Sequence, residues 1–153
     1  MVNGCIKIRK AKKKDFENFF KLQKEFFQQY RAVSRYPIKA LSKKDCKKEF
    51  SSRFGKNRFF YVAECNKELI GYLFGIIEES VYGRWGIIED LFITKKFQGK
   101  GIATLLKDKF ITILKNKQIK YCKIDVNPEN KKAIKVYHKW GFRVDKYRMT
   151  KIL

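Results

Sequence analysis

Residues 98–104, QGKGIAT, place two glycines and a lysine where an apolar, β-rich segment gives way to a helical pattern. The start of a helix leaves several backbone N–H groups unpaired and carries partial positive charge, so it suits a phosphate group. Gly99 and Gly101 allow a tight turn, and an anion can approach their amides without meeting a Cβ atom. The same residues also fit an ordinary helix start, since neither common glycine-rich nucleotide motif is present. Both interpretations stay open on these residues alone.

Helical and strand patterns alternate around this turn. Apolar residues at helical spacing predict a helix from Asp15 to about Tyr30, and Ser42 is placed to cap a second helix that reaches about Phe54. The period then changes to that of β-strands, joined by short turns typical of hairpins. The other expected elements are a strand at 5–9, three consecutive antiparallel strands at 58–65, 68–79 and 85–93, a helix from 99, a strand at 121–126, a helix capped by Asn127 and ended by Gly141, and a strand near 143–152.

This order, β-α-α-β-β-β-α-β-α-β, shows no repeat, linker or composition break. We therefore expect a single domain over residues 1–153.

Charge is the strongest compositional feature, because 37 Lys and Arg face 15 Asp and Glu, a formal net charge of +22. Such a charge attracts polyanions at long range. Base readout and bidentate phosphate contacts favour arginine, whereas the basic residues here are mostly lysines spread along the chain. The pattern indicates a solvated lysine coat with weak, nonspecific nucleic-acid binding rather than a nucleic-acid function.

The four cysteines, Cys5, Cys46, Cys65 and Cys122, form no Cys-x-x-Cys pair and have only His138 to share a metal with. We expect free, mostly buried thiols and no metal. The chain shows neither signal-peptide features nor an apolar run long enough to span a bilayer, so we expect a cytoplasmic protein without a membrane segment.

Two segments carry marker residues at fixed spacing, Gln98-x-x-Gly101-x-Ala103 and Asn130-x-x-Ala133-x-x-x-Tyr137-x-x-x-Gly141-Phe142. They resemble two motifs of the GNAT superfamily of N-acetyltransferases. The first is the Q/R-x-x-G-x-G/A signature, with Gln98 and Ala103 as its less common permitted choices. The likeness covers essentially the whole chain, although it rests on pattern alone before Phe59. It implies an α/β (α+β) fold of GNAT type, with a mixed central sheet of six to seven strands flanked by four helices.

The resemblance implies acetyl-CoA as co-substrate, bound between the strands IIEDLFI and YCKIDV, which splay apart in this fold. The backbone of Leu91, Phe92 and Ile93 would hold the pantetheine arm in the manner of an added strand. The turn would bind the pyrophosphate, and the next helix would face the cofactor. The residues assigned to these two roles are Gln98, Gly99, Lys100, Gly101, Ile102, Ala103 and Thr104 in the turn, and Asn130, Lys131 and Lys132 in the helix.

The resemblance also suggests two catalytic residues. An amine at neutral pH is mostly protonated, so a base must take its proton, and Glu89 resembles the glutamate of spermidine/spermine N-acetyltransferases. Tyr137 would contact the cofactor's sulfur and protonate the departing thiolate. Glu89 could instead be a salt-bridge partner, and Tyr137 a core residue. Cys122 has no histidine to activate it, so we expect direct transfer.

The acceptor would lie opposite the cofactor, near Tyr30 and Tyr36 and beside Glu89 and Asp90. The local acids favour an ammonium group, so we expect a small or polyamine-like primary amine. A protein N-terminus or lysine is the competing acceptor. The competing functions are those of a non-catalytic CoA-binding module and of an RNA-binding basic protein, and a homodimer is compatible with all of them.

Overall fold

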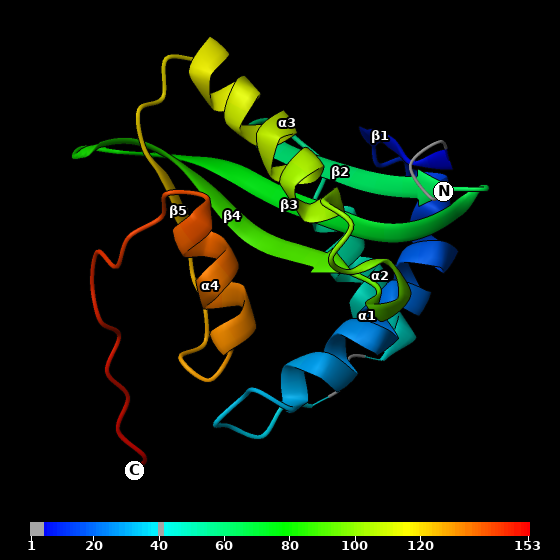
Figure 1. Ribbon diagram of the computed structural model, residues 1–153, viewed down its shortest axis with the longest axis horizontal. Coiled ribbons are helices and arrows are strands. Elements are labelled where there is room, and N and C mark those ends of the chain that lie inside the picture. The colour runs from blue at the N-terminus through cyan, green and yellow to red at the C-terminus, as the bar shows by residue number, and fades with distance from the viewer. Residues whose placement is uncertain (1–4, 40–41) are drawn as a thin grey trace.

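The computed structural model of the protein describes residues 5–39 and 42–153. Five strands in these residues form one sheet, in the order β1-β2-β3-β4-β5 (Figure 1). The first four pair antiparallel with their neighbours, whereas β5 runs parallel to β4. The predicted mixed sheet is thus confirmed, but the expected number of strands, six to seven, is wrong. The strands are β1 (Lys7–Lys10), β2 (Arg58–Cys65), β3 (Glu68–Ser80), β4 (Gly83–Ile93) and β5 (Cys122–Ile124).

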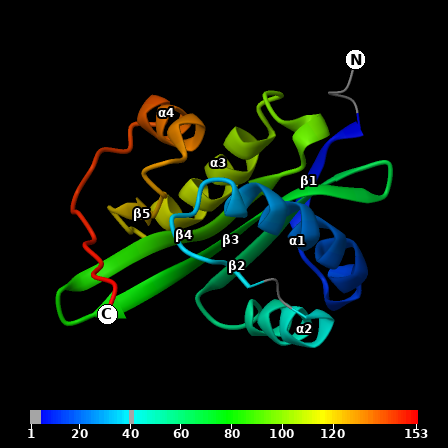
Figure 2. The same ribbon diagram turned by 90° about the horizontal axis from the view of Figure 1, so that it is seen from below.

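The described residues also form the four expected α-helices, which lie around the sheet (Figures 1 and 2). One core cluster joins α3 to one face of the sheet, and a second, aromatic cluster joins α1 and α2 to the other face. Helix α4 lies beside β5. The helices are α1 (Phe16–Arg31), α2 (Lys43–Ser52), α3 (Ile102–Asn116) and α4 (Lys131–Lys139), and two short 3₁₀ turns are η2 (Lys13–Asp15) and η3 (Lys95–Phe97).

Local sequence signals account for the start of α2 and for the β2–β3 hairpin. The Ser42 side chain accepts a hydrogen bond from the Asp45 amide at 3.1 Å, so the expected cap is confirmed. The hairpin turns through Asn66 and Lys67, which both have positive φ. Such a two-residue turn matches the twist of paired strands.

The start of α4 differs from the prediction. Asn127 does not cap the helix, because residues 127–130 form a separate turn closed by the Asn130 amide on the Asn127 carbonyl at 2.8 Å. Asn130 is the cap, and its side chain accepts from the Ala133 amide at 3.1 Å. The predicted end at Gly141 is confirmed, since this glycine adopts φ +87° directly after the helix.

The strand predicted near residues 143–152 is wrong, because residues 143–153 form neither strand nor helix. The segment has strand-forming residues, but it lies on no buried face that would fix a register.

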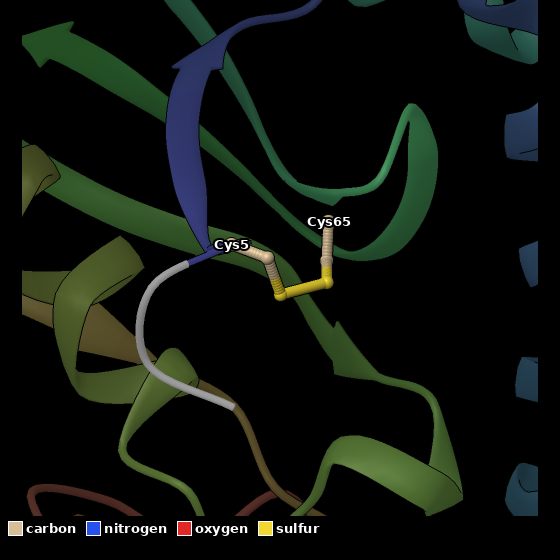
Figure 3. Close-up of a disulfide and its surroundings, with 2 residues drawn as sticks. All are labelled: Cys5 and Cys65. Carbon is tan, nitrogen blue, oxygen red and sulfur yellow. A yellow bond between two sulfur atoms is a disulfide. The ribbon is translucent and has the colours of Figure 1, made fainter. Parts of the chain in front are cut away.

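The expectation of four free thiols is also wrong, because Cys5 and Cys65 form a disulfide (Figure 3). These residues are 60 positions apart, so no short spacing reveals the pair. The antiparallel pairing of Lys7 with Glu64 brings them together. Cys46 and Cys122 remain free, as expected. In the part of the chain that is described, no helix is long and apolar enough to cross a membrane.

Candidate functional site

Strands β4 and β5 are paired over only three residues each. The ladder runs from Gly86 with Cys122 to Ile88 with Ile124 and stops there. Residues 89–93 therefore have β3 on one side and, among residues 5–39 and 42–153, no strand on the other. This arrangement agrees with the expected splay of the two strands, and it leaves one backbone edge of β4 open to an extended ligand.

Glu89 is the first residue beyond this ladder, and it occupies a bulge. The register with β3 shifts at this point, so Glu89 has no paired residue on β3. Its side chain is exposed and makes no hydrogen bond or ion pair with another described residue. Partial burial raises the pKa of Glu89, and the nearby carboxylates of Asp90, Asp125 and Glu78 raise it further, against the opposing charge of Arg53. The alternative role of Glu89 as a salt-bridge partner is therefore not supported, because its carboxylate pairs with no described Lys or Arg.

Asp90 is held by Arg53, at the end of α2. The Asp90 Oδ2 atom accepts a hydrogen bond from Arg53 Nη2 at 2.5 Å. The Arg53 side chain is only 4% exposed. Its guanidinium carbon lies 4.8–5.8 Å from four ring centroids, those of Phe19, Phe60, Tyr72 and Phe74.

Sequence reasoning missed Arg53, although a signal was present. Cys46, Phe50 and Arg53 follow one another at helical spacing, so the arginine continues the apolar stripe of α2.

The turn between β4 and α3 presents a row of free amides. Gly99 and Gly101 both have φ +77°, and a Cβ atom built on either would meet no heavy atom within 4 Å. The N–H groups of residues 99–101 donate to no other described residue. Helix α3 has no side-chain cap, and its first backbone bond runs from Leu105 to Gly101, so the amides of residues 102–104 are free as well. Space and donors for an anion coincide here.

Gln98 and Ile102 hold this turn in place, Gln98 through hydrogen bonds and Ile102 through core packing. The Gln98 side-chain nitrogen donates to the Ile93 carbonyl at 2.9 Å and to Gln29 of α1 at 3.1 Å. Its side-chain oxygen accepts from Lys132 of α4 at 2.8 Å. The Ile102 side chain is buried in the core, so only its backbone amide faces the turn.

Helix α1 supports the same turn through a second set of bonds. The Glu25 carboxylate accepts from the Thr94 hydroxyl at 2.5 Å and from the Lys95 amide at 2.7 Å. The loop is thus fixed to α1 at its start, while its glycines stay open.

Helix α4 turns a half-buried face towards the interior without joining the core. None of its residues is fully buried, and none of its apolar residues belongs to either core cluster. Tyr137 packs against Trp140 and Phe142, at 5.6 and 6.3 Å between ring centroids. Its hydroxyl makes no hydrogen bond with another described residue, and burial raises the pKa of Tyr137 to about 12. This phenol therefore keeps its proton at neutral pH.

The remaining residues assigned to α4 have different surroundings. The side-chain oxygen of Asn130 accepts the capping hydrogen bond of the helix. Lys131 and Lys132 are exposed at the first turn. Through Gln98, Lys132 links this turn of α4 to the glycine turn. Both lysines are accessible to an anion at the helix start, where the dipole is also favourable.

The predicted acceptor residues lie on α1 and on the loop that follows it. Tyr30 stacks on Phe26, whose ring in turn meets Phe92 of β4 at 5.7 Å. Tyr36 is exposed in the loop. Arg35 of the same loop pairs with Glu129 before α4 at 2.5 Å, so the loop reaches the segment that leads into α4.

These positions fit a coenzyme A molecule. Six unbonded amides and two lysines suit a diphosphate, and the free edge of β4 suits a pantetheine arm. Next to the two glycines no side chain fills the space, because a Cβ atom at either position would meet no heavy atom within 4 Å. Cys122 is unsuited to covalent catalysis, since burial raises the pKa of its thiol to about 12.

The chain resembles known proteins in sequence and in fold. It is 29% identical over 142 residues to an uncharacterized N-acetyltransferase of Methanocaldococcus jannaschii, which covers 88% of this chain. The chain spans 59% of the length of that relative.

Two solved structures share the fold. An aminoglycoside acetyltransferase from an uncultured soil metagenomic sample has a TM-score of 0.77 at 16% identity, covering 100% of this chain and 99% of its own. Glucosamine-6-phosphate N-acetyltransferase from Arabidopsis thaliana has a TM-score of 0.72 at 20% identity, covering 96% and 97%.

The model of the acetyltransferase (GNAT) family matches residues 16–142, from the first helix to the residue after Gly141. That span includes the splayed strands, the glycine turn and Tyr137. The chain therefore belongs to the acetyltransferase (GNAT) family, whose members are N-acetyltransferases that use acetyl-CoA.

Proposed function

We propose that residues 1–153 act as one N-acetyltransferase domain that moves the acetyl group of acetyl-CoA directly to a primary amine of a small, polycationic molecule. The observation that carries this proposal is the set of free amides over residues 99–104, with open space above both glycines. Acetyl-CoA supplies an activated acetyl thioester, and the protein's own groups must hold it and manage two protons.

Glu89 is the proposed base. It is exposed on the bulge where the pairing of β4 with β5 ends, and its carboxylate makes no hydrogen bond or ion pair with another described residue. Its raised pKa brings its proton affinity closer to that of an amine. A water molecule can relay the proton if the amine stands further away.

Tyr137 is the proposed acid. Its hydroxyl keeps its proton at neutral pH and has no other acceptor among the described residues. Leu91 lies on the open edge of β4, and its backbone N–H group can donate a hydrogen bond to the acyl oxygen. Together these groups provide one base, one acid and a hydrogen-bond donor on a scaffold of strand and helix.

The acceptor class follows from local charge. Asp90, Asp125 and Glu78 are near enough to Glu89 to raise its pKa; Arg53 pairs with Asp90 and Arg148 with Asp125, so the four acids outnumber these two arginines around the bulge. An exposed net charge is screened over roughly 10 Å at moderate salt, so the local acids govern the last approach. A polyamine-like or aminosugar acceptor with several ammonium groups fits this field. The fold by itself does not determine which acceptor is used, because one fold can serve many substrates.

The test is a panel of polyamines, aminoglycosides, amino sugars, amino acids and short peptides, with free-thiol release as the readout. We expect turnover with a small polycation, and turnover about 100-fold lower in Glu89→Gln. Release with peptides alone would replace the proposed acceptor with a protein amine. CoA binding without release, unchanged by Glu89→Gln, would indicate a silent binding module. RNA binding that falls steeply with salt, with no CoA binding, would overturn the proposal.

A further inference from the structure

A hollow lies where α2 leads into β2, and we call it the α2–β2 hollow. Its volume is about 360 Å³, within the range of small-molecule sites, roughly 300–1,000 Å³. Three segments that are far apart in the sequence line it: the end of β1, the turn and first residues of β2, and the residue that follows α3. The lining residues are 10–11, 53–61 and 117.

The α2–β2 hollow is lined by cations without partners. Lys10, Lys56, Arg58 and Lys117 are all exposed, and none of their side chains makes a hydrogen bond or ion pair with another described residue. Arg58 has a cation–π contact, with its guanidinium carbon 6.0 Å from the Phe74 ring centroid. No Asp or Glu is among the described lining residues. Four like charges around one hollow repel each other, so a bound anion would relieve this repulsion as well as pair with them.

The turn between α2 and β2 adds three free amides. The N–H groups of Gly55, Lys56 and Asn57 donate to no other described residue. The turn is closed by the Arg58 amide on the Gly55 carbonyl at 3.4 Å, and the Asn57 carbonyl is fixed to β3 by the Ile77 amide at 2.9 Å. Asn57 has a left-handed backbone, with φ +59°. Successive unbonded N–H groups in a turn of this kind form a concavity that binds anions.

Arg53 also lines the hollow, although its side chain is only 4% exposed. Its Nη2 atom pairs with Asp90, whereas its Nε and Nη1 atoms have no hydrogen-bond partner among the described residues. Buried polar groups are normally satisfied. The wall of the hollow therefore has donor capacity that the described residues do not use.

The hollow lies far from the glycine turn. Strands β2 and β4 both pair antiparallel with β3, so they run in the same direction; the hollow is at the start of β2, and the glycine turn follows the end of β4. On β3, Ile77 bonds to Asn57 beside the hollow and Gly71 pairs with Ile93 before the turn, and six residues of strand span about 20 Å. Helix α3 likewise runs from the glycine turn to Lys117 (Figure 1). A diphosphate held at the glycine turn would leave the hollow free.

We propose that the α2–β2 hollow is a second anion site, which binds the phosphate of a small phosphorylated molecule on the amides of residues 55–57 and the four unpaired cations. Phe54 and Phe59 are half-buried and also line the hollow, so an uncharged part of the ligand can rest on aromatic surface. A compact hollow favours a small molecule, because a nucleic-acid backbone is bound along an extended groove that follows successive phosphates.

Amide spectra of ¹⁵N-labelled protein, titrated with inorganic diphosphate at constant ionic strength, test the site. The signals of residues 55–57 should shift and saturate. Signals of residues 99–104 report the glycine turn separately in the same sample, and saturating coenzyme A should leave the shifts at 55–57 unchanged. The hollow is read from its own signals even in a protein that binds no coenzyme A, so this test does not depend on the proposed function. No saturable shift at residues 55–57 would overturn the proposal.

Charge reversal separates a built site from the overall positive charge. Lys56→Glu/Lys117→Glu should weaken diphosphate binding at residues 55–57 at least about tenfold, because two of the four cations become acids. The matched control is Lys21→Glu/Lys109→Glu, which changes the net charge equally at exposed helix positions that do not line the hollow. That control should bind as wild type does. Equal weakening in both variants would assign the binding to net charge and contradict the site.

The source of the phosphate is tested by comparing a sugar phosphate with a short single-stranded RNA that lacks terminal phosphates. The sugar phosphate should bind more tightly, and Lys56→Glu/Lys117→Glu should abolish the difference. Tighter binding of the RNA at residues 55–57 would replace the small molecule by a nucleic-acid backbone and overturn the proposal.

Discussion

Ile88 and Asp90 stand two residues apart on β4 and face opposite sides of the sheet. In a regular strand such residues share a face. Here the register steps from Ile88 opposite Gly75 to Asp90 opposite Phe74. Ile88 consequently joins the core on the α3 side, whereas Asp90 meets Arg53 on the α2 side. The bulge removes Glu89 from the alternation where β5 pairing ends.

Replacing Glu89 by glutamine should lower kcat/KM for the amine by about 100-fold. The reaction needs the carboxylate ionised, and its pKa is raised, so wild-type kcat/KM should fall as pH drops towards a value above the ordinary 4.5. A pH profile of thiol release checks both points. The acid limb assigned to Glu89 should vanish in the variant while CoA affinity stays unchanged. An acid limb that persists unaltered would remove Glu89 from the proton transfer.

Replacing Tyr137 by phenylalanine should lower kcat by about 100-fold and leave the melting temperature nearly unchanged. The ring keeps its contacts with Trp140 and Phe142, so only the hydroxyl is lost. Steady-state kinetics and thermal unfolding of the same preparation separate the two effects. Equal kcat values for the two proteins would show that another group protonates the thiolate.

Removing the Asp90 carboxylate should destabilise the fold by about 3 kcal/mol, because the buried Arg53 guanidinium then keeps only the more distant and exposed Glu49 carboxylate, at 3.6 Å. The Nε and Nη1 atoms of Arg53 already lack partners, so the pair as a whole adds little stability. The double variant Arg53→Met/Asp90→Leu should therefore be more stable than Asp90→Ala in urea unfolding. A double variant as unstable as the single one would assign the pair a large net stabilisation.

Breaking the Cys5–Cys65 disulfide should cost about 4 kcal/mol, as expected for a cross-link that closes a loop of this length in the unfolded chain. Urea unfolding of wild type with and without a thiol reductant measures the effect. Cys5→Ser is the control, since reductant should not weaken it further. Wild type that is equally stable in both conditions would show that the cross-link does not form in solution.

Local signals in the sequence predicted much of the fold. Hydrophobic period, the Ser42 cap and the hairpin turn identify α1, α2, β2 and β3, because each depends on neighbours in the chain. The cap of α4 was misplaced because Asn127 and Asn130 are both good caps three residues apart. Pro128 favours the earlier one, whereas the turn hydrogen bond to Asn127 selects the later one.

Tertiary pairing accounts for what the sequence did not reveal. The disulfide depends on the β1–β2 register, and the bulge at Glu89 on the β3–β4 register. Neither register is visible from spacing along one chain. The glycine turn was identifiable from its residues, but its open amides and its bonds to α1 through Glu25 and Gln98 required the fold.

Calorimetric titration of coenzyme A into the protein tests the central claim most directly. We predict saturable one-to-one binding that weakens at least about tenfold, or 1.4 kcal/mol, in Gly99→Ala and in Gly101→Ala, because each added methyl enters the space above the free amides. Gly141→Ala is the matched control: it has a similar φ of +87° and an equally open Cβ position, but it lies at the end of α4. It should bind as wild type does. A titration without heat, or equal losses in all three variants, would contradict a diphosphate seat at residues 99–104.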